Sequence, residues 1–282
     1  MSNFMTEAFD ALEEKARQEI PKNEGDYTGD DGLLYCGKCQ TPKQCRIDVL
    51  GKIRTPFCLC KCEAENRDAQ QAEDRRKEQE RRIKDNRRMA FHLDEMSGWT
   101  FENDDGESPK ITEAMRRYVE NFPQLLENGK GLLLYGTVGT GKTFAACEVA
   151  NALIDVGYRV MVTNFARMIN IIQGTFEGRQ EYIDSLNNYH LLVVDDLGVE
   201  RQTEFMREMV YNIIDARYRA GLPMIVTTNM SIEEIKKPSD ISNSRIYDRI
   251  IERCFPVEVS GGSRRRKKVR NEYADMKQLL CL

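Results

Sequence analysis

The stretch GTVGTGKT at residues 136–143 constrains the fold of this chain more than any other feature. It follows an apolar run at 131–135 and precedes a helix-like segment at 144–154. A glycine-rich loop lets successive backbone N–H groups converge on phosphate oxygens, and the N-terminus of the following helix favours negative charge at the same place. The order strand, loop, helix is that of a P-loop, so we predict a site for a nucleoside triphosphate.

The residues of this loop have separate predicted roles. We expect Lys142 to reach the β- and γ-phosphates and Thr143 to bind Mg²⁺. The predicted nucleotide-binding residues are Gly136, Thr137, Val138, Gly139, Thr140, Gly141, Lys142, Thr143 and Phe144. The alternative is a chance glycine-rich turn, and the complete spacing together with both flanks weighs against it.

Composition limits the compartment and the class of protein. The 282 residues suffice for one sizeable core and a smaller appendage. No apolar run approaches the about 20 residues of a membrane span, and the first ten residues show no secretory signal pattern. We therefore expect a cytoplasmic protein without membrane contact. The net charge of −4 argues against a uniformly basic, DNA-coating protein, although a basic run lies at 264–270.

The chain divides into five segments by composition. We expect an N-terminal helix (5–20) and linker at 1–30, a zinc-binding module at 31–65, a charged helical linker at 66–98, the nucleotide-binding domain at 99–270 and a C-terminal tail at 271–282. The linker is almost entirely charged, so we interpret it as a spacer or partner-binding arm. Trp99 and Phe101 mark the docking edge of the domain that follows.

Within residues 99–270 helical and strand patterns alternate. Helices are expected at 111–128, 143–155, 165–173 and 204–219, and strands at 132–135, 159–163, 190–195, 224–228 and 255–259. Such alternation indicates a parallel sheet in an α/β fold.

Six of the nine cysteines lie between residues 36 and 62. The sequence CGKC at 36–39 predicts a zinc knuckle, which a second cysteine pair about twenty residues later would complete as a tetrahedral site. The favoured Zn²⁺ ligands are Cys36, Cys39, Cys60 and Cys62. Cys58 is the main rival for one of the last two positions and Cys45 also stays open; disulfides, free thiols and an iron–sulfur cluster are alternatives to zinc. A segment this short cannot hold a core, so metal binding should supply its folding free energy.

Two later strand ends carry side chains that hydrolysis needs. The run LLVVDD at 191–196 predicts that Asp195 supports the Mg²⁺ held by Thr143 and that Asp196 orients or activates the attacking water. The run IVTTN at 225–229 places Asn229 where it can contact the γ-phosphate or that water. The alternative for Asn229 is the cap of a helix that starts at 231.

The sequence SRIYDR at 244–249 places two arginines four residues apart and therefore on one helix face. Arginine pairs well with phosphate, so one of the two is a candidate to act on a neighbouring subunit's nucleotide. Surface ion pairs with Asp248 or Glu252 are the alternative.

In this order and spacing, GTVGTGKT, LLVVDDLG, IVTTN and SRIYDR resemble the AAA+ domain of DnaC/DnaI-type replicative helicase loaders. Transposition-helper ATPases of the IstB type share this core. The resemblance covers residue 91 to the C-terminus, and the cysteine cluster is similar, more loosely, to the zinc-binding region of DnaI-like loaders. It implies a five-stranded parallel sheet of order 5-1-4-3-2, ATP bound at a subunit interface and Mg²⁺-dependent hydrolysis. It also implies that Arg249 is the finger arginine and that Arg265 senses phosphate.

For function, the resemblance implies an ATPase that loads a hexameric replicative helicase of the DnaB type onto single-stranded DNA. ATP, Mg²⁺ and Zn²⁺ are the implied cofactors, and the protein is expected to self-associate into an ATP-dependent oligomer. One alternative is an IstB-like transposition helper that assembles on duplex DNA. Another is a non-hydrolysing adaptor that uses the nucleotide only as structure, which the pair Asp195 and Asp196 argues against. The tail at 271–282 contains no motif that indicates a role.

Overall fold

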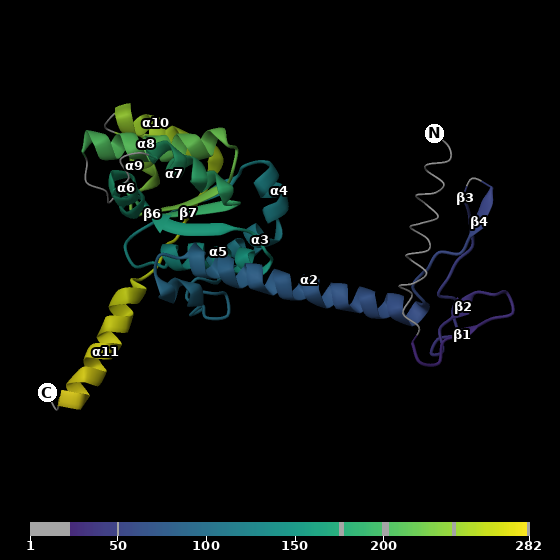
Figure 1. Ribbon diagram of the computed structural model, residues 1–282. Coiled ribbons are helices and arrows are strands. Elements are labelled where there is room, and N and C mark those ends of the chain that lie inside the picture. Colours follow the sequence, from purple (N-terminus) through teal and green to yellow (C-terminus); the bar gives the residue numbers. More distant parts are fainter. Residues whose placement is uncertain (1–22, 50, 175–177, 199–202, 239–240, 281–282) are drawn as a thin grey trace. The chain divides into compact units, whose positions relative to one another are not determined.

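The computed structural model describes residues 23–49, 51–174, 178–198, 203–238 and 241–280. The chain forms two compact units, Met1–Gln79 and Glu80–Leu282 (Figure 1). The helix expected at 5–20 lies outside the described residues. Among the described helices, none is both long and apolar enough to span a bilayer.

A five-stranded sheet forms the centre of the second unit. Its strands are β5 (Gly131–Tyr135), β6 (Val160–Asn164), β7 (Leu191–Leu197), β8 (Met224–Thr228) and β9 (Cys254–Glu258). They lie in the order β6-β7-β8-β5-β9, and every neighbouring pair is parallel. Numbered from β5 and read from β9, this is the order 5-1-4-3-2, so the predicted fold class is confirmed.

Helices cover both faces of this sheet (Figure 1). One face packs against α6 (Phe165–Gly174), α8 (Glu204–Arg219) and α10 (Ile241–Arg253), and the other packs against α3 (Pro109–Glu120) and α5 (Lys142–Asp155). The shorter helices are η1 (Asp94–Gly98), α4 (Phe122–Glu127), α7 (Arg179–Ser185), η2 (Leu186–Asn188) and α9 (Ile232–Lys236). Because both faces are covered, the strands are continuous apolar runs rather than alternating ones.

Three elements differ from the sequence-based expectation. The single helix predicted at 111–128 is wrong: α3 ends at Glu120 and α4 begins at Phe122, because Pro123 lacks the N–H that a continuous helix needs. Strand β7 continues through Leu197, two residues beyond the predicted end. The basic run belongs to α11 (Arg264–Leu280), a helix that continues across the expected boundary between 270 and 271.

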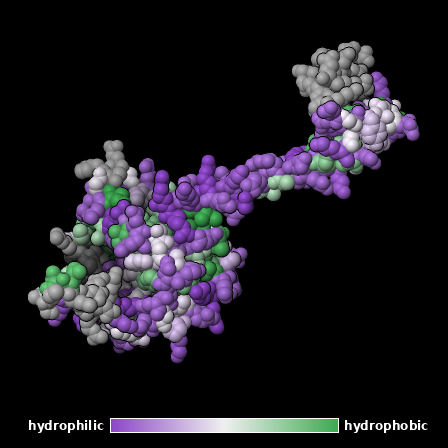
Figure 2. All heavy atoms as spheres, turned by 90° about the horizontal axis from the view of Figure 1, so that it is seen from below, coloured by the Kyte–Doolittle hydropathy of each residue, from purple (hydrophilic) through white to green (hydrophobic). Residues whose placement is uncertain are grey.

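The helix α2 (Lys61–Ala90) contains the charged segment expected to be a linker. Its surface is largely hydrophilic (Figure 2), and of its 30 residues the one that is buried is Ala90. Immediately after α2, Phe91 pairs with Val162 on the outer edge of β6. This contact covers an edge that would otherwise present unpaired backbone groups.

Between residue 23 and the start of α2, the described part of the first unit has only short strands as regular structure. Strand β1 (Tyr27–Thr28) pairs with β2 (Leu34–Tyr35), and β3 (Ile47–Val49) pairs with β4 (Lys52–Arg54), both antiparallel. Strands of two or three residues bury little apolar surface, so this unit needs another source of stability.

Candidate nucleotide site and cysteine cluster

The P-loop joins β5 to α5 and forms one wall of a cavity of about 460 Å³. Gly139 and Gly141 have φ angles of +86° and +99°, in the left-handed region that favours glycine. A Cβ at Gly139 would clash with Ser263 Oγ, and one at Gly141 would lie 3.0 Å from Arg264 Cζ. The turn therefore requires glycine at both positions, and the cavity has the size of a small-molecule site.

Lys142 is buried at the start of α5. Its ammonium donates to the backbone oxygens of Gly136 and Thr137, at 2.9 and 2.8 Å, and to Asn229 Oδ1 at 2.8 Å. Burial lowers the pKa of Lys142, and the carboxylates of Asp196 and Asp195 oppose this shift. The structure thus brings the P-loop lysine and the asparagine at the end of β8 into direct contact.

The helix-cap alternative for Asn229 is wrong. The N-cap of α9 is Ser231, whose hydroxyl accepts from the backbone N–H of Glu234 while the Glu234 carboxylate accepts from the N–H of Ser231. Asn229 lies before this capping box and lines the cavity instead.

Thr143 and Asp195 meet as the sequence predicts. Thr143 Oγ1 donates to Asp195 Oδ1 at 2.8 Å, and Thr227 Oγ1 donates to the same oxygen at 2.6 Å. Hydroxyl and carboxylate oxygens are the ligands that Mg²⁺ prefers, so Thr143 and Asp195 fit the pair that would hold this ion.

Asp196 occupies an unusual backbone conformation next to this pair. Its φ angle is +58°, and its N–H donates to Thr227 Oγ1 at 3.0 Å, which holds the turn in place. The side chain lines the cavity, where burial and then the charge of Asp195 raise the pKa of Asp196. A strained acid at a cavity wall is typical of a functional position.

Two arginines of α11 lie against the site. Arg265 lines the cavity, and its charge contributes to the pKa shifts of Lys142 and Asp196, so it lies near both residues. Arg264, which the sequence did not single out, donates its N–H to Gly139 O at 2.9 Å and pairs with Asp105 at 3.0 Å. Both arginines of this turn thus line the cavity.

Trp99 forms the aromatic end of the cavity. Its ring lies 5.8 Å from the ring of Phe144 with an interplanar angle of 29°, and both side chains line the cavity together with Asn103 and Asp105. The sequence indicated only a domain edge here. A stack between residues 45 positions apart is a tertiary contact, and periodicity does not reveal such contacts.

Arg249 lies outside the cavity of its own chain, on α10. Its Nη2 lies 2.7 Å from Asp215 Oδ1, and its guanidinium lies over the ring of Tyr211, with 4.4 Å from Cζ to the ring centroid. Its side chain is 22% exposed. The ion pair is therefore made with Asp215 of α8, whereas the sequence had suggested Asp248 or Glu252.

Glu148 of α5 is a buried carboxyl group near the cavity. It is 2% exposed, and its Oε1 has no hydrogen-bond partner among the described residues. Burial, with a further contribution from Asp104, raises the pKa of Glu148 from its ordinary value of 4.5 to about 8. The folded protein therefore binds this proton more tightly than the unfolded chain does.

A pH dependence of stability follows from Glu148. Because its pKa is raised on folding, its contribution is fully present below pH 4.5 and is lost as pH rises to about 8. Glu148→Gln is expected to match the wild type near pH 4 and to exceed its unfolding free energy by about 5 kcal/mol at pH 9. Urea unfolding at several pH values checks this, with the exposed Glu120→Gln as control; a constant difference across pH would contradict it.

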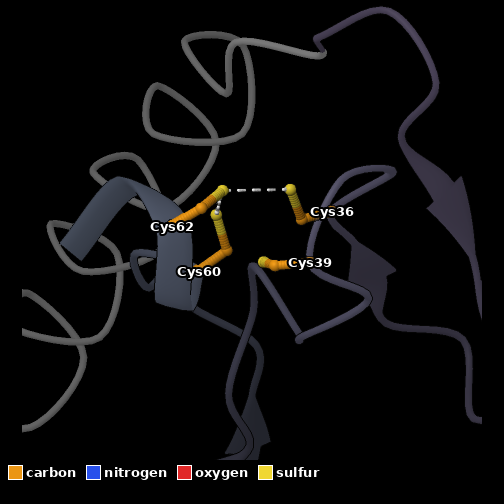
Figure 3. Close-up of side chains that lie close together, drawn as sticks. All are labelled: Cys36, Cys39, Cys60 and Cys62. Atoms are coloured by element: carbon orange, nitrogen blue, oxygen red, sulfur yellow. Dashed lines mark hydrogen bonds between the residues drawn. The ribbon is translucent and has the colours of Figure 1, made fainter. Parts of the chain in front are cut away.

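Four cysteine side chains converge in the first unit (Figure 3). They are Cys36, Cys39, Cys60 and Cys62, and their sulfur atoms all lie within 4.8 Å of one another. The distances Cys36 Sγ–Cys62 Sγ and Cys60 Sγ–Cys62 Sγ are 3.6 and 3.4 Å. Sulfur atoms on a tetrahedral Zn²⁺ are separated by about 3.8 Å, because each Zn–S bond is about 2.3 Å. The cluster thus fits a metal ion of this kind.

The surroundings of Cys36 and Cys39 suit thiolates, whereas burial raises the pKa of Cys60. Backbone N–H groups of Cys39 and Lys38 donate to the Cys36 sulfur and lower its pKa. The Thr41 hydroxyl lies 3.0 Å from Cys39 Sγ. Cys58 Sγ lies 3.7 Å from Pro42 O and is not a member of the cluster.

A buried ion-pair network lies in the same unit as the cluster and connects residues before and after it in sequence. Lys43 is fully buried and donates to Asp26 Oδ2 at 2.8 Å, and its Nζ lies 3.1 Å from Glu63 Oε1. Glu63 directly follows the last cysteine of the cluster, so this ion-pair network and the cluster depend on the same backbone. Breaking such a buried network by removing one partner is strongly destabilising.

Comparisons with known proteins agree with this site. Residues 67–272 match the family described as IstB-like ATP binding protein. The replicative helicase loader DnaI of Bacillus subtilis (strain 168) is 26% identical over 186 residues, which are 61% of this chain and 60% of that protein. The replicative helicase loader DnaC of Escherichia coli (strain K12) is 28% identical over 139 residues, 48% of this chain and 54% of that protein.

A solved structure supports the fold. The crystal structure of DnaI is similar with a TM-score of 0.51 at 22% identity, covering 61% of this chain and 96% of that one. The chain thus spans just over half the length of the two curated relatives. Since the family match covers most of the sequence and includes the whole P-loop site, the chain belongs to the IstB-like ATP-binding proteins.

Proposed function

We propose that this protein is an ATPase that loads a DnaB-type replicative helicase onto single-stranded DNA. The observation that carries the proposal is the convergence of Lys142, Thr143, Asp196 and Asn229 from three strand ends on one cavity, with Asp195 bonded to Thr143. Its relatives DnaI and DnaC are named replicative helicase loaders, which favours this use of the ATPase.

In the proposed reaction each residue has a separate task. Lys142 binds the β- and γ-phosphates, and Asn229, which holds its ammonium, positions it at the end of β8. Thr143 and Asp195 would hold a Mg²⁺ ion, which when bound neutralises phosphate charge. Asp196 accepts a hydrogen bond from the attacking water and orients it. Arg265 binds phosphate from the first turn of α11.

The remaining parts of the chain would bind the partners. We assign the cysteine cluster to Zn²⁺ and give the zinc module and the charged helix α2 the task of holding the helicase. ATP-dependent self-association would place single-stranded DNA along basic side chains of the assembly. Binding of ATP would order the assembly, and hydrolysis would release it.

A second function is favoured by the family match itself. The family is described as IstB-like ATP binding protein. A transposition helper of that type, assembling on duplex DNA, would use the same cavity. Stimulation of ATP hydrolysis by DNA separates the two proposals. We expect single-stranded DNA to stimulate more strongly than duplex DNA of equal length, and stronger stimulation by duplex DNA would favour the transposition helper.

Arg249 has its own test in a mixed assembly. Arg249→Ala is expected to bind ATP normally but to lose hydrolysis by about 10³-fold, as when an arginine finger is removed. Mixing it with Lys142→Ala should restore part of the activity, because one subunit then supplies the arginine and the other an intact cavity. Phosphate release from the separate and mixed proteins measures this.

The control variant is Arg219→Ala, because Arg219 also pairs with the Asp215 carboxylate. Arg219 Nε lies 2.8 Å from Asp215 Oδ2, and its side chain is 74% exposed. Arg219→Ala removes one ion pair of Asp215 and is expected to keep full hydrolysis. Equal losses in both variants, or no recovery on mixing, would mean that Arg249 only stabilises the contact between α8 and α10.

A further inference from the structure

We infer that Arg87 and Asn151 form a relay between the end of α2 and the aromatic end of the nucleotide cavity. The inference rests on the proposed ATPase function. It assigns positioning roles to two residues that are not among the described residues lining the cavity.

Asn151 is the centre of the relay. It lies on α5 and is 1% exposed. Its Nδ2 donates to the backbone oxygens of Met96 and Trp99, at 2.9 and 3.0 Å, and to Cys147 O at 3.0 Å. Its Oδ1 accepts from Arg87 Nη1 at 3.0 Å. One buried amide thus fixes the turn η1 to the P-loop helix, and its donors and acceptor are all used within the protein.

The turn held by Asn151 ends in Trp99. The Trp99 ring stacks on Phe144, and both side chains line the cavity. Since Lys142 and Asp196 define the phosphate end, the aromatic end remains for the base of the nucleotide. A base can stack on an aromatic side chain, so the position of Trp99 affects affinity for a nucleotide but not for a phosphate chain.

Arg87 connects this turn to α2. Besides Asn151, its guanidinium donates to Ser97 O at 3.5 Å and pairs with Asp155 at the end of α5. Any movement of the last turns of α2 therefore displaces the contacts that hold Trp99. Coupling between two binding sites is reciprocal, so a nucleotide stacked on Trp99 also changes the position that α2 prefers. The affinity of α2 for a partner protein would therefore depend on whether a nucleotide is bound.

The chain contains one tryptophan, so its fluorescence reports on Trp99 alone. The experiment measures Trp99 emission and calorimetric Kd for Mg²⁺-ATP and for Mg²⁺-tripolyphosphate, which has the phosphates but no base. We expect ATP to shift the emission and tripolyphosphate to leave it unchanged. Calorimetric binding of ATP without a change in emission would overturn the inference.

The relay is tested with Arg87→Ala, because truncating Asn151 would leave buried carbonyls unpaired and can unfold the domain. Arg87→Ala is expected to raise the Kd for ATP about tenfold, the loss expected for hydrogen bonds to a charged group. The Kd for tripolyphosphate should stay within about twofold of the wild type, since the P-loop is untouched. The control is Arg88→Ala, the exposed neighbour on the same helix, which should change neither constant.

Each other outcome has a defined meaning. If Arg87→Ala binds ATP as the wild type does, or weakens both ligands equally, the relay is overturned while the proposed ATPase stands. If the wild-type protein binds neither ATP nor tripolyphosphate, the proposed ATPase itself is overturned.

Discussion

Replacing Lys142 with alanine is expected to lower the rate of ATP hydrolysis by about 10³-fold and to weaken ATP binding. The ammonium is the buried cation at the phosphate end of the cavity, and its contacts with Gly136, Thr137 and Asn229 fix its position before the nucleotide arrives. A preorganised charge of this kind stabilises the transition state without further rearrangement. Steady-state phosphate release and calorimetric ATP binding measure the two effects.

The control for Lys142→Ala is Lys110→Ala, which removes an exposed lysine from α3. This variant should keep the wild-type rate, and both variants should unfold near the wild-type temperature because the P-loop backbone is unchanged. Retention of more than about a tenth of the activity in Lys142→Ala would contradict the assignment of this cavity as the ATPase site.

Removing zinc is expected to unfold the cysteine module while ATP binding is retained. The module contains strands of two or three residues, so the metal must supply most of its folding free energy. Structural zinc sites contribute about 10 kcal/mol or more in small domains. Hydrogen exchange of the full-length protein, before and after chelation, should show loss of protection at 31–65 and unchanged protection at 131–197.

Serine substitutions identify the ligands. Cys60→Ser should reproduce the effect of the chelator and release zinc, because Cys60 is buried in the cluster. Cys45→Ser should do neither, since Cys45 is exposed and does not belong to the cluster. Purified protein that contains no zinc and still protects residues 31–65 would refute the metal site.

Local patterns explain why much of the site could be predicted. The P-loop glycines, the acids that end β7 and the asparagine that ends β8 each follow a strand, and parallel strands bring their carboxyl ends together. The cysteine spacing likewise identified the four side chains that converge. In these cases a short segment contains both the structural signal and the functional residue.

Other features depend on contacts that no local pattern records. Trp99 faces the cavity because it stacks on Phe144, and Arg264 approaches the P-loop because its N–H binds Gly139 O. Asn151 likewise accepts a hydrogen bond from Arg87, which lies 64 positions away in sequence. The break between α3 and α4 is different, because Pro123 was a visible signal of it.

We propose that ATP switches this chain between holding and releasing a replicative helicase. The most direct measurement is loading of a purified DnaB-type helicase onto closed circular single-stranded DNA, with the wild-type protein and with Lys142→Ala, in the presence of Mg²⁺-ATP. We expect the wild-type protein to increase helicase bound to the circle and subsequent unwinding, and Lys142→Ala to lose this effect. Equal loading with and without the protein, or full loading by Lys142→Ala, would contradict the account.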